Sequence, residues 1–373
     1  MIMGSNTLMA MEGFVVCLVI SREVLGAAAA AVLQPPPPMY VFGDSYLDVG
    51  NNNYLSGPNV PRVNRPYYGI DFPGFPTGRF SNGYNTADYI AKKIGLAAGS
   101  PPPYLSVAWS SSLVVSTALT IGMSYASGGA GILDSTNAGD NIPLSKQVQY
   151  FNATRSKMVA AVGSGAVDTL LSRSVVLIGA GGNDLSAFAN AQQQSDAAAF
   201  YGSLMSNYSA AITDLYTLGA RNFAITNVAL AGCLPVARVL DAAGSCSDYR
   251  NYLADRFHDA LRSLLADLAA RLPGFLYSLA DSFALMVDTF YDPQASSGFT
   301  DVASACYGGG RLGAEAECSL NSTICANRDQ HYFWDNVHIT QQAAKQRAQA
   351  FYDGPAKYTT PINFKQLVQM TAA

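Results

Sequence analysis

Residues 39–45 read MYVFGDS, a short apolar run followed by a glycine and two polar residues. The apolar run at 39–42 predicts a short buried strand that ends at Gly43, which puts Asp44 and Ser45 on the turn beyond its carboxyl end. Open α/β sheets keep their functional sites at that edge. Ser45 is therefore a candidate reactive side chain.

The segments that follow alternate between strand-like and helix-like patterns. Residues 47–83 are rich in Asn, Gly and Pro and predict a long irregular loop. We predict further strands at residues 121–125, 175–178, 223–226 and 275–279. We predict amphipathic helices at residues 85–94, 198–218, 249–272 and 341–351. This alternation predicts a parallel sheet with helices on both faces.

Composition limits the class of protein. The chain has 373 residues, of which 49% are hydrophobic, enough for one large domain with a closed core. With 22 basic and 26 acidic residues and no basic run, nucleic acid is not expected as a partner. No stretch reaches the roughly 20 apolar residues that a membrane-spanning helix needs. The oligomeric state cannot be deduced from these features.

The N-terminus resembles a secretory leader. Residues 14–20 (FVVCLVI) are apolar and an alanine run follows, although no Lys or Arg precedes them. We predict a signal peptide at 1–31, a proline-rich spacer at 32–38, one catalytic domain at 39–362 and a C-terminal tail at 363–373. Three glycosylation sequons suit a secreted protein: Asn152, Asn207 and Asn321.

The cysteines point the same way. Cys17 belongs to the predicted leader, Cys233 and Cys246 close a short loop, and three more cluster in a Gly-rich polar segment: Cys306, Cys318 and Cys325. Five mature cysteines cannot all pair internally, so one thiol stays free or pairs elsewhere, and the connectivity is open. No ligand spacing typical of zinc accompanies them.

A serine hydroxyl needs a neighbouring base to become a nucleophile. His338 follows Asp335 by three residues in FWDNVH at 333–338, so the carboxylate can hold Nδ1–H while Nε2 faces Ser45. Asp255 and His258 show the same spacing inside the predicted helix 249–272, where an ordinary surface pair is expected. We therefore favour Asp335 and His338.

Two glycine-rich turns after predicted strands can supply donors for an oxyanion. One is ASGGAG at 126–131 and the other is Gly182-Asn183-Asp184. Either turn alone carries little weight, because glycine turns after strands are usually only turns. Asp44 and Asp184 are interpreted as residues that cap their own turns, and His331 as a loop residue.

The 47–83 loop contains two further features. Asn51-Asn52-Asn53 is interpreted as hydrogen bonding within the loop. Five aromatic residues either cover an apolar acyl pocket or fold the loop onto the core: Tyr67, Tyr68, Phe72, Phe75 and Phe80.

Four blocks, in order, resemble the plant GDSL esterase/lipase family of SGNH hydrolases: VFGDSYLDVGNN at 41–52, SYASGGAGI at 124–132, IGAGGNDL at 178–185 and FWDNVHIT at 333–340. The resemblance implies a three-layer α/β/α, flavodoxin-like fold with a central, mainly parallel sheet. It also implies a small or polymer-borne ester substrate and no metal or organic cofactor.

Carried over residue by residue, the resemblance implies Ser45 as nucleophile, His338 as base, Asp335 behind it, and Gly129 and Asn183 as oxyanion donors. Gly128 is the alternative to Gly129. The sequence departs from the family pattern without removing any of these groups: Tyr46 replaces Leu, Ser124 replaces Asn, Ala229 and Ala231 replace prolines, Tyr307 replaces Cys and Ile339 replaces Pro.

Two of these departures have consequences. Ile339 is expected to loosen the turn that aims His338, and Tyr307 accounts for the odd number of cysteines. The leading hypothesis is a secreted serine ester hydrolase. An acyltransferase or polysaccharide deacetylase with the same site, and a non-catalytic secreted binding protein of the same fold, stay open as alternatives.

Overall fold

The computed structural model describes residues 35–191, 196–316 and 318–372. The predicted signal peptide, Cys17 and the first part of the proline-rich spacer lie outside the described residues. No helix among the described residues is long and apolar enough to cross a membrane.

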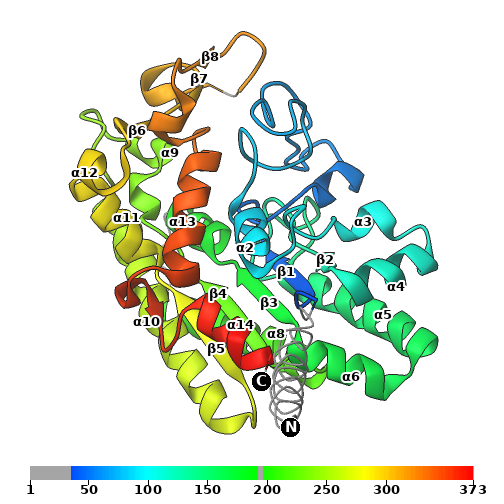
Figure 1. The fold of residues 1–373 in the computed structure, drawn as a ribbon. Coiled ribbons are helices and arrows are strands. Elements are labelled where there is room, and N and C mark those ends of the chain that lie inside the picture. The colour runs from blue at the N-terminus through cyan, green and yellow to red at the C-terminus, as the bar shows by residue number, and fades with distance from the viewer. Residues whose placement is uncertain (1–34, 192–195, 317, 373) are drawn as a thin grey trace, which may run out of the picture. The chain divides into compact units, whose positions relative to one another are not determined.

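A six-stranded sheet forms the centre of the domain (Figure 1). Its strands lie in the order β10-β5-β4-β3-β1-β2, and every neighbouring pair is parallel except β10 with β5. Their bounds are β1 (Met39–Gly43), β2 (Gly122–Ser124), β3 (Val175–Gly179), β4 (Asn222–Thr226), β5 (Leu276–Ala280) and β10 (Thr359–Thr360). All five predicted strands are confirmed to within two residues.

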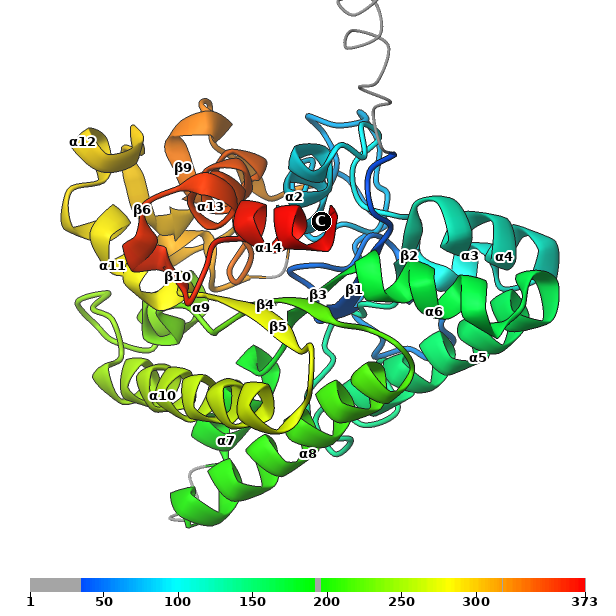
Figure 2. The ribbon, with the colours of Figure 1, turned by 60° about the horizontal axis from the view of Figure 1, so that its bottom comes forward.

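Helices cover both faces of this sheet, as Figure 2 shows. One face packs against α4 (Ser111–Thr120), α5 (Leu144–Val162), α6 (Ser164–Arg173), α8 (Ala197–Thr217) and α10 (Asp248–Arg271). The other packs against α2 (Thr86–Ile94), α13 (Gln341–Asp353) and α14 (Phe364–Ala372). The predicted three-layer α/β/α fold is therefore confirmed.

Side chains that point alternately to the two faces of the sheet form two hydrophobic cores. In β1, Tyr40 and Phe42 belong to the cluster on one face, whereas Met39 and Val41 belong to the cluster on the other. Successive side chains of a strand point to opposite faces, so an uninterrupted apolar run suits a strand covered on both sides. The segment predicted as a tail contains α14, whose Phe364 is buried in the second cluster.

The remaining elements lie mostly in connections. They are α3 (Tyr104–Val107), α7 (Gly182–Asn190), α9 (Pro235–Arg238), α11 (Ser282–Tyr291), α12 (Pro293–Ser297), β6 (Asp301–Ala305), β7 (Tyr307–Gly308), β8 (Thr323–Ile324) and β9 (His331–Phe333). His331, predicted as a loop residue, instead begins β9 because this segment pairs with β6.

Disulfides close two of these connections. Cys233 pairs with Cys246 and Cys306 pairs with Cys325, while Cys318 is a buried free thiol. The odd cysteine is thus one of the three clustered in the Gly-rich segment.

The Asn51-Asn52 pair ties the long loop to the sheet. Asn51 Nδ2 donates to the carbonyls of Ser124 and Ala126, and Asn52 Nδ2 donates to the carbonyl of Gly128, each at 2.9 Å. These bonds join segments more than 70 residues apart. The interpretation of the asparagines as hydrogen-bonded within the loop was therefore too narrow. They position the glycine turn at 126–131 next to β1.

Candidate active site

Ser45 lies on a tight turn at the carboxyl end of β1. Gly43 has a φ of +138°, and a Cβ there would lie 2.0 Å from the Gly179 carbonyl oxygen, so only glycine fits. The Asp44 amide donates to that carbonyl, and the amide side chain of Gln147 bonds both backbone groups of Gly43 at 2.8 Å. The backbone that carries Ser45 is therefore held from both sides.

His338 connects Ser45 to Asp335. Its Nε2 is 2.8 Å from Ser45 Oγ, and its Nδ1 is 2.9 Å from both carboxylate oxygens of Asp335. With the proton on Nδ1, that nitrogen donates to Asp335 and Nε2 can accept the serine proton. The structure thus brings together three residues that span 293 positions of the chain.

Asp335 is buried yet well supplied with donors. Its Oδ1 accepts from the Val337 and His338 amides at 2.8 and 2.7 Å, and its Oδ2 accepts from the Tyr68 hydroxyl at 2.7 Å. Burial raises the pKa of Asp335, but the charge and hydrogen bonds of His338 and the amide bonds outweigh it and hold the pKa at about 2. Asp335 is therefore ionised at neutral pH.

Tyr68 was missed as a partner of Asp335. The sequence identified it only as one aromatic residue of the loop, because a tyrosine gives no local sign of a contact 267 positions away. Among the five loop aromatics, Tyr68 and Phe80 are buried, Phe75 is 63% exposed, and none lines the pocket beside Ser45. The loop thus folds onto the core.

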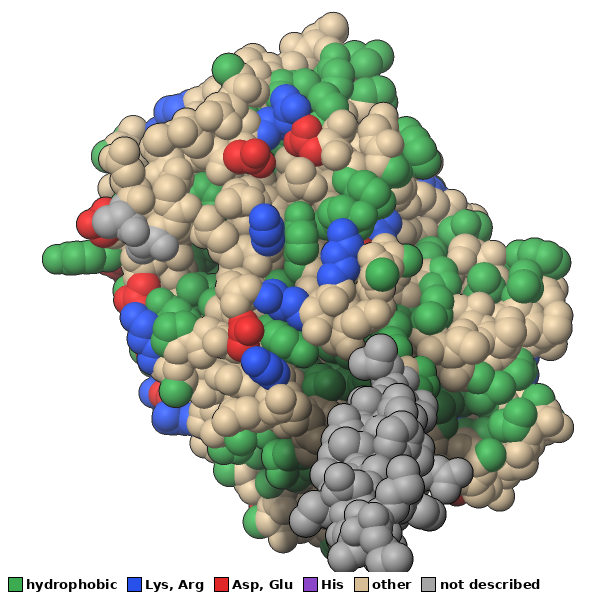
Figure 3. All heavy atoms as spheres, in the orientation of Figure 1, with side chains coloured by type: hydrophobic (Ala, Val, Ile, Leu, Met, Phe, Trp, Pro, Cys, Tyr) green, Lys and Arg blue, Asp and Glu red, His purple; other side chains and the backbone are tan. Residues whose placement is uncertain are grey.

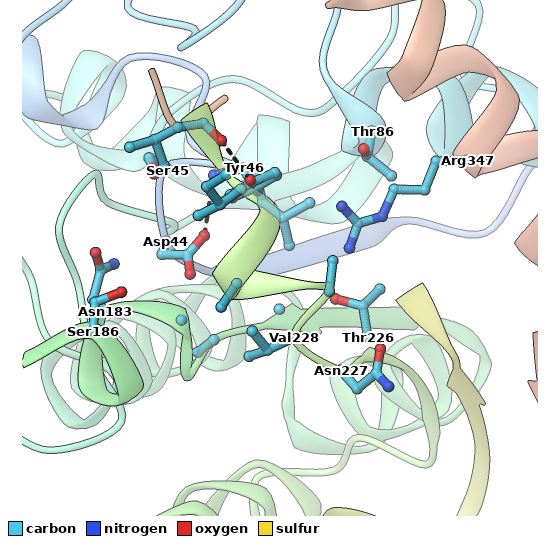
Figure 4. Close-up of a pocket in the computed structure, with 18 residues that line it drawn as sticks. Asp44, Ser45, Tyr46, Thr86, Asn183, Ser186, Thr226, Asn227, Val228 and Arg347 are labelled. Atoms are coloured by element: carbon cyan, nitrogen blue, oxygen red, sulfur yellow. Dashed lines mark hydrogen bonds between the residues drawn. The ribbon is translucent and has the colours of Figure 1, made fainter. Parts of the chain in front are cut away.

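The turn that carries His338 is supported by a residue outside the family pattern. The Tyr46 hydroxyl donates to the Val337 carbonyl at 2.7 Å (Figure 4). The Tyr46 ring centroid lies 5.6 Å from that of the His338 imidazole. The Trp334 amide donates to the His338 carbonyl at 2.7 Å. Tyr46 therefore braces the turn that Ile339 was expected to loosen.

Among the hydrogen bonds of the described residues, the Ser45 and Gly129 amides have no acceptor. The Gly128 amide instead donates to Asp48 Oδ2 at 3.0 Å, which leaves it unable to serve an oxyanion. Asn183, in the first turn of α7, donates one amide hydrogen to the Ala130 carbonyl at 2.9 Å and lines the pocket (Figure 4). A primary amide has a second hydrogen for a ligand.

Asp44, which precedes Ser45, and Asp184, which follows Asn183, accept different hydrogen bonds. Asp44 Oδ1 accepts from the Tyr46 amide at 3.0 Å, so the predicted turn cap is confirmed. Burial raises the pKa of Asp44 to about 6, against the lowering effect of that amide bond. Asp184 was predicted to cap its own turn, but it accepts from the amides of Ile132 and Leu133, so it joins the two glycine-rich turns.

His258 is separated from the Ser45 site. Its Nδ1 is 2.7 Å from Asn227 Nδ2, and its Nε2 is 3.7 Å from Asp281. The described residues give it no bond to Asp255, so the expected surface pair is replaced by contacts with the residues that directly follow β4 and β5. Over the described ranges, no group of three or more His, Cys, Asp or Glu side chains could hold a metal ion.

A pocket opens beside Ser45. The residues that line it come from the ends of β1, β3 and β4 and the segments that follow them, from α2, α7 and α13, and from the turn before His338: Asp44, Ser45, Tyr46, Leu47, Thr86, Gly179, Ala180, Gly182, Asn183, Ser186, Thr226, Asn227, Val228, Ala229, Ala231, Leu234, Val337 and Arg347. The pocket therefore lies at the carboxyl edge of the sheet, as the strand order predicts.

The sequence is similar to known proteins over most of its length. The sequence model of the family described as GDSL-like Lipase/Acylhydrolase matches residues 39–351. Two Arabidopsis thaliana proteins named GDSL esterase/lipase are similar to this chain. One is 36% identical over an alignment that covers 88% of this chain and 89% of the relative. The other is 33% identical over an alignment that covers 89% of this chain and 87% of the relative. The chain therefore belongs to the GDSL lipase/acylhydrolase family and is a carboxylic ester hydrolase.

Proposed function

We propose that the protein is a secreted serine esterase that works through an acyl-enzyme on Ser45. The observation that carries this proposal is the unbroken hydrogen-bonded chain from Ser45 Oγ through His338 to Asp335, with heavy-atom distances of 2.8 and 2.9 Å. These distances are within the range in which a base can take a serine proton.

The reaction follows from this arrangement. Ser45 Oγ attacks the ester carbonyl while His338 Nε2 takes the hydroxyl proton, and Asp335 stabilises the imidazolium. Collapse of the tetrahedral intermediate expels the alcohol, which receives that proton from His338. Water, activated by the same imidazole, then hydrolyses the acyl-enzyme and releases the acid.

Three donors are proposed for the oxyanion: the Ser45 amide, the Gly129 amide and the Asn183 side chain. The free amides of Ser45 and Gly129 and the second amide hydrogen of Asn183 support this assignment. Preorganised donors of this kind stabilise the charge that develops on the carbonyl oxygen.

Secretion is supported by the two disulfides together with the leader-like sequence at 1–31. Disulfides form and persist in oxidising compartments and are rare in the cytosol. Secretion can be tested on protein produced in a secretory host. A glycosidase that removes N-linked glycans should lower the mass of the secreted protein, because the sequons would carry glycans if the chain passes through the secretory pathway.

The catalytic assignment is tested with p-nitrophenyl butyrate. Ser45→Ala, Asp335→Ala and His338→Ala should each remove most hydrolysis in folded protein, whereas His258→Ala, which changes the other D-x-x-H histidine, should retain it. Full activity of His338→Ala would contradict the triad. Failure of a fluorophosphonate to label Ser45 in folded protein would favour a binding protein, and transesterified product with an added alcohol would favour an acyltransferase.

A further inference from the structure

Arg347 is a buried cation in the wall of the pocket. It projects from α13, is 8% exposed, and lines the pocket together with Ser45 and Asn183. Figure 4 shows it at one side of the pocket, with Ser45 and Asn183 at the other. Arginine is always charged in proteins, so the pocket wall carries a positive charge.

The Arg347 guanidinium forms no ion pair with any described residue. Nη2 donates to the Ser282 hydroxyl, but Nε is buried without a hydrogen-bond partner among the described residues. Within the same residues, no carboxylate oxygen lies within 4 Å of the guanidinium. A buried guanidinium that is not fully hydrogen-bonded is costly, and such groups are normally paired.

The neighbours of Arg347 offset the cost of burying its charge only in part. Its guanidinium carbon lies 5.5 Å from the Tyr46 ring centroid and 5.6 Å from that of Phe351. Cation–π contacts at the outer edge of their range are weak. Asp44 also lines the pocket, where burial raises its pKa and the Arg347 charge opposes that rise. One Asp44 oxygen accepts from the Tyr46 amide, and Asp44 forms no ion pair with Arg347.

The position of His338 decides which half of the ester enters the pocket. The leaving alcohol must lie against His338 Nε2 to receive its proton. His338 does not line this pocket, although Ser45 does. The acyl group is therefore the half that extends into the pocket toward Arg347.

We propose that the enzyme selects esters whose acyl group carries a free carboxylate, which Arg347 binds. This inference rests on the proposed function and names its substrate class. A carboxylate in the pocket would bind the part of the guanidinium that faces it and supply an ion pair that Arg347 lacks among the described residues. Guanidinium–carboxylate bonds are among the stronger hydrogen bonds in proteins.

Basic residues also lie outside the pocket. A surface groove beside α2 and α13 is lined by Lys92, Lys93 and Lys345, and Arg347 borders it as well. Figure 3 shows Lys and Arg side chains over this face of the molecule. Lys345 is exposed on the same helix as Arg347, so it serves as a matched control for loss of one positive charge.

The test compares monoethyl glutarate with ethyl pentanoate, two esters with acyl chains of five carbons that differ in a terminal carboxylate. We expect wild-type enzyme to favour the glutarate ester in kcat/KM by roughly tenfold to a hundredfold, the factor that a charge-assisted hydrogen bond confers. Arg347→Met should lower this ratio at least about tenfold, Arg347→Lys should lower it less, and Lys345→Met should leave it unchanged.

A wild-type preference for ethyl pentanoate, or a ratio that survives Arg347→Met, would overturn the proposal. If Arg347→Met does not fold, as judged by circular dichroism, inhibition of the wild-type enzyme decides: glutarate must inhibit more strongly than pentanoate. Hydrolysis of ethyl pentanoate without any preference would refute only the carboxylate selectivity, whereas absence of all ester turnover and of fluorophosphonate labelling would refute the proposed function itself.

Discussion

The Tyr68–Asp335 contact offers a quantitative test of how the proposed triad is supported. The change is Tyr68→Phe, which removes one hydroxyl and keeps the ring that packs in the cluster around Trp334. Burial, and then the Asp335 charge, hold the pKa of Tyr68 well above its usual range, so the hydroxyl donates to the carboxylate. We expect both stability and turnover to fall.

The magnitude follows from the bonds that remain. A hydrogen bond to a charged group contributes about 1.5–3 kcal/mol to the free energy of unfolding. Asp335 would keep the Val337 and His338 amides and the imidazole, so we expect a loss of about 2 kcal/mol. Asp335 should stay ionised at pH 7 because its pKa starts at about 2, so kcat should fall less than about tenfold.

Urea unfolding at pH 7 measures the loss of stability. Tyr208→Phe is the matched control, because the Tyr208 hydroxyl is buried without a partner in the described part of the chain and its removal should cost nothing. The lowered pKa of Asp335 gives stability that is present above about pH 4 and lost as the pH falls toward 2. The difference between wild type and Tyr68→Phe should therefore narrow over that range. Equal unfolding free energies for the two at pH 7 would refute the reasoning.

Three further changes probe the site. Tyr46→Phe removes the bond to the Val337 carbonyl, and a neutral bond of about 1 kcal/mol predicts a roughly fivefold fall in kcat with little change in KM; an unchanged kcat would refute the bracing role. Asn183→Ala should lower kcat by about 10²–10³ if its amide binds the oxyanion, and a change confined to KM would contradict this. Asp44→Asn should change how the free energy of unfolding depends on pH between about pH 4 and 6. The pKa of Asp44 is raised to about 6 in the folded protein, so Asp44 contributes stability at a pH below the pKa of the unfolded chain, and this contribution is lost as the pH rises through 6. An unaltered slope in urea unfolding measured across this range would contradict the raised pKa.

Local chemistry explains why much of the fold could be predicted. The buried strands are continuous apolar runs, and helices such as residues 249–272 repeat apolar positions at helical spacing, so each element is written in adjacent residues. Asp335 and His338 could likewise be paired from their spacing, because three residues place both on one turn. Gly43 belongs to this class as well, since a short strand followed by glycine predicts a sharp turn.

Contacts between distant segments could not be predicted in this way. The bonds from Tyr68 to Asp335, from Asp184 to the turn near Ile132 and from Tyr46 to Val337 join residues between about 50 and 290 positions apart. Most of these side chains lie in loops and Asp184 lies in the first turn of α7, and nothing in their neighbours along the chain identifies a partner.

The sequence by itself determined the α/β architecture and the residues offered for catalysis, because periodicity and short-range spacing are local properties. Only the tertiary structure decided which groups support Asp335, that the Gly128 amide is hydrogen-bonded whereas no acceptor is found for the Gly129 amide among the described residues, and that Arg347 faces the pocket without an ion pair to any of them. Burial and hydrogen-bond partnership arise when distant segments pack together, so they exist only in the folded chain.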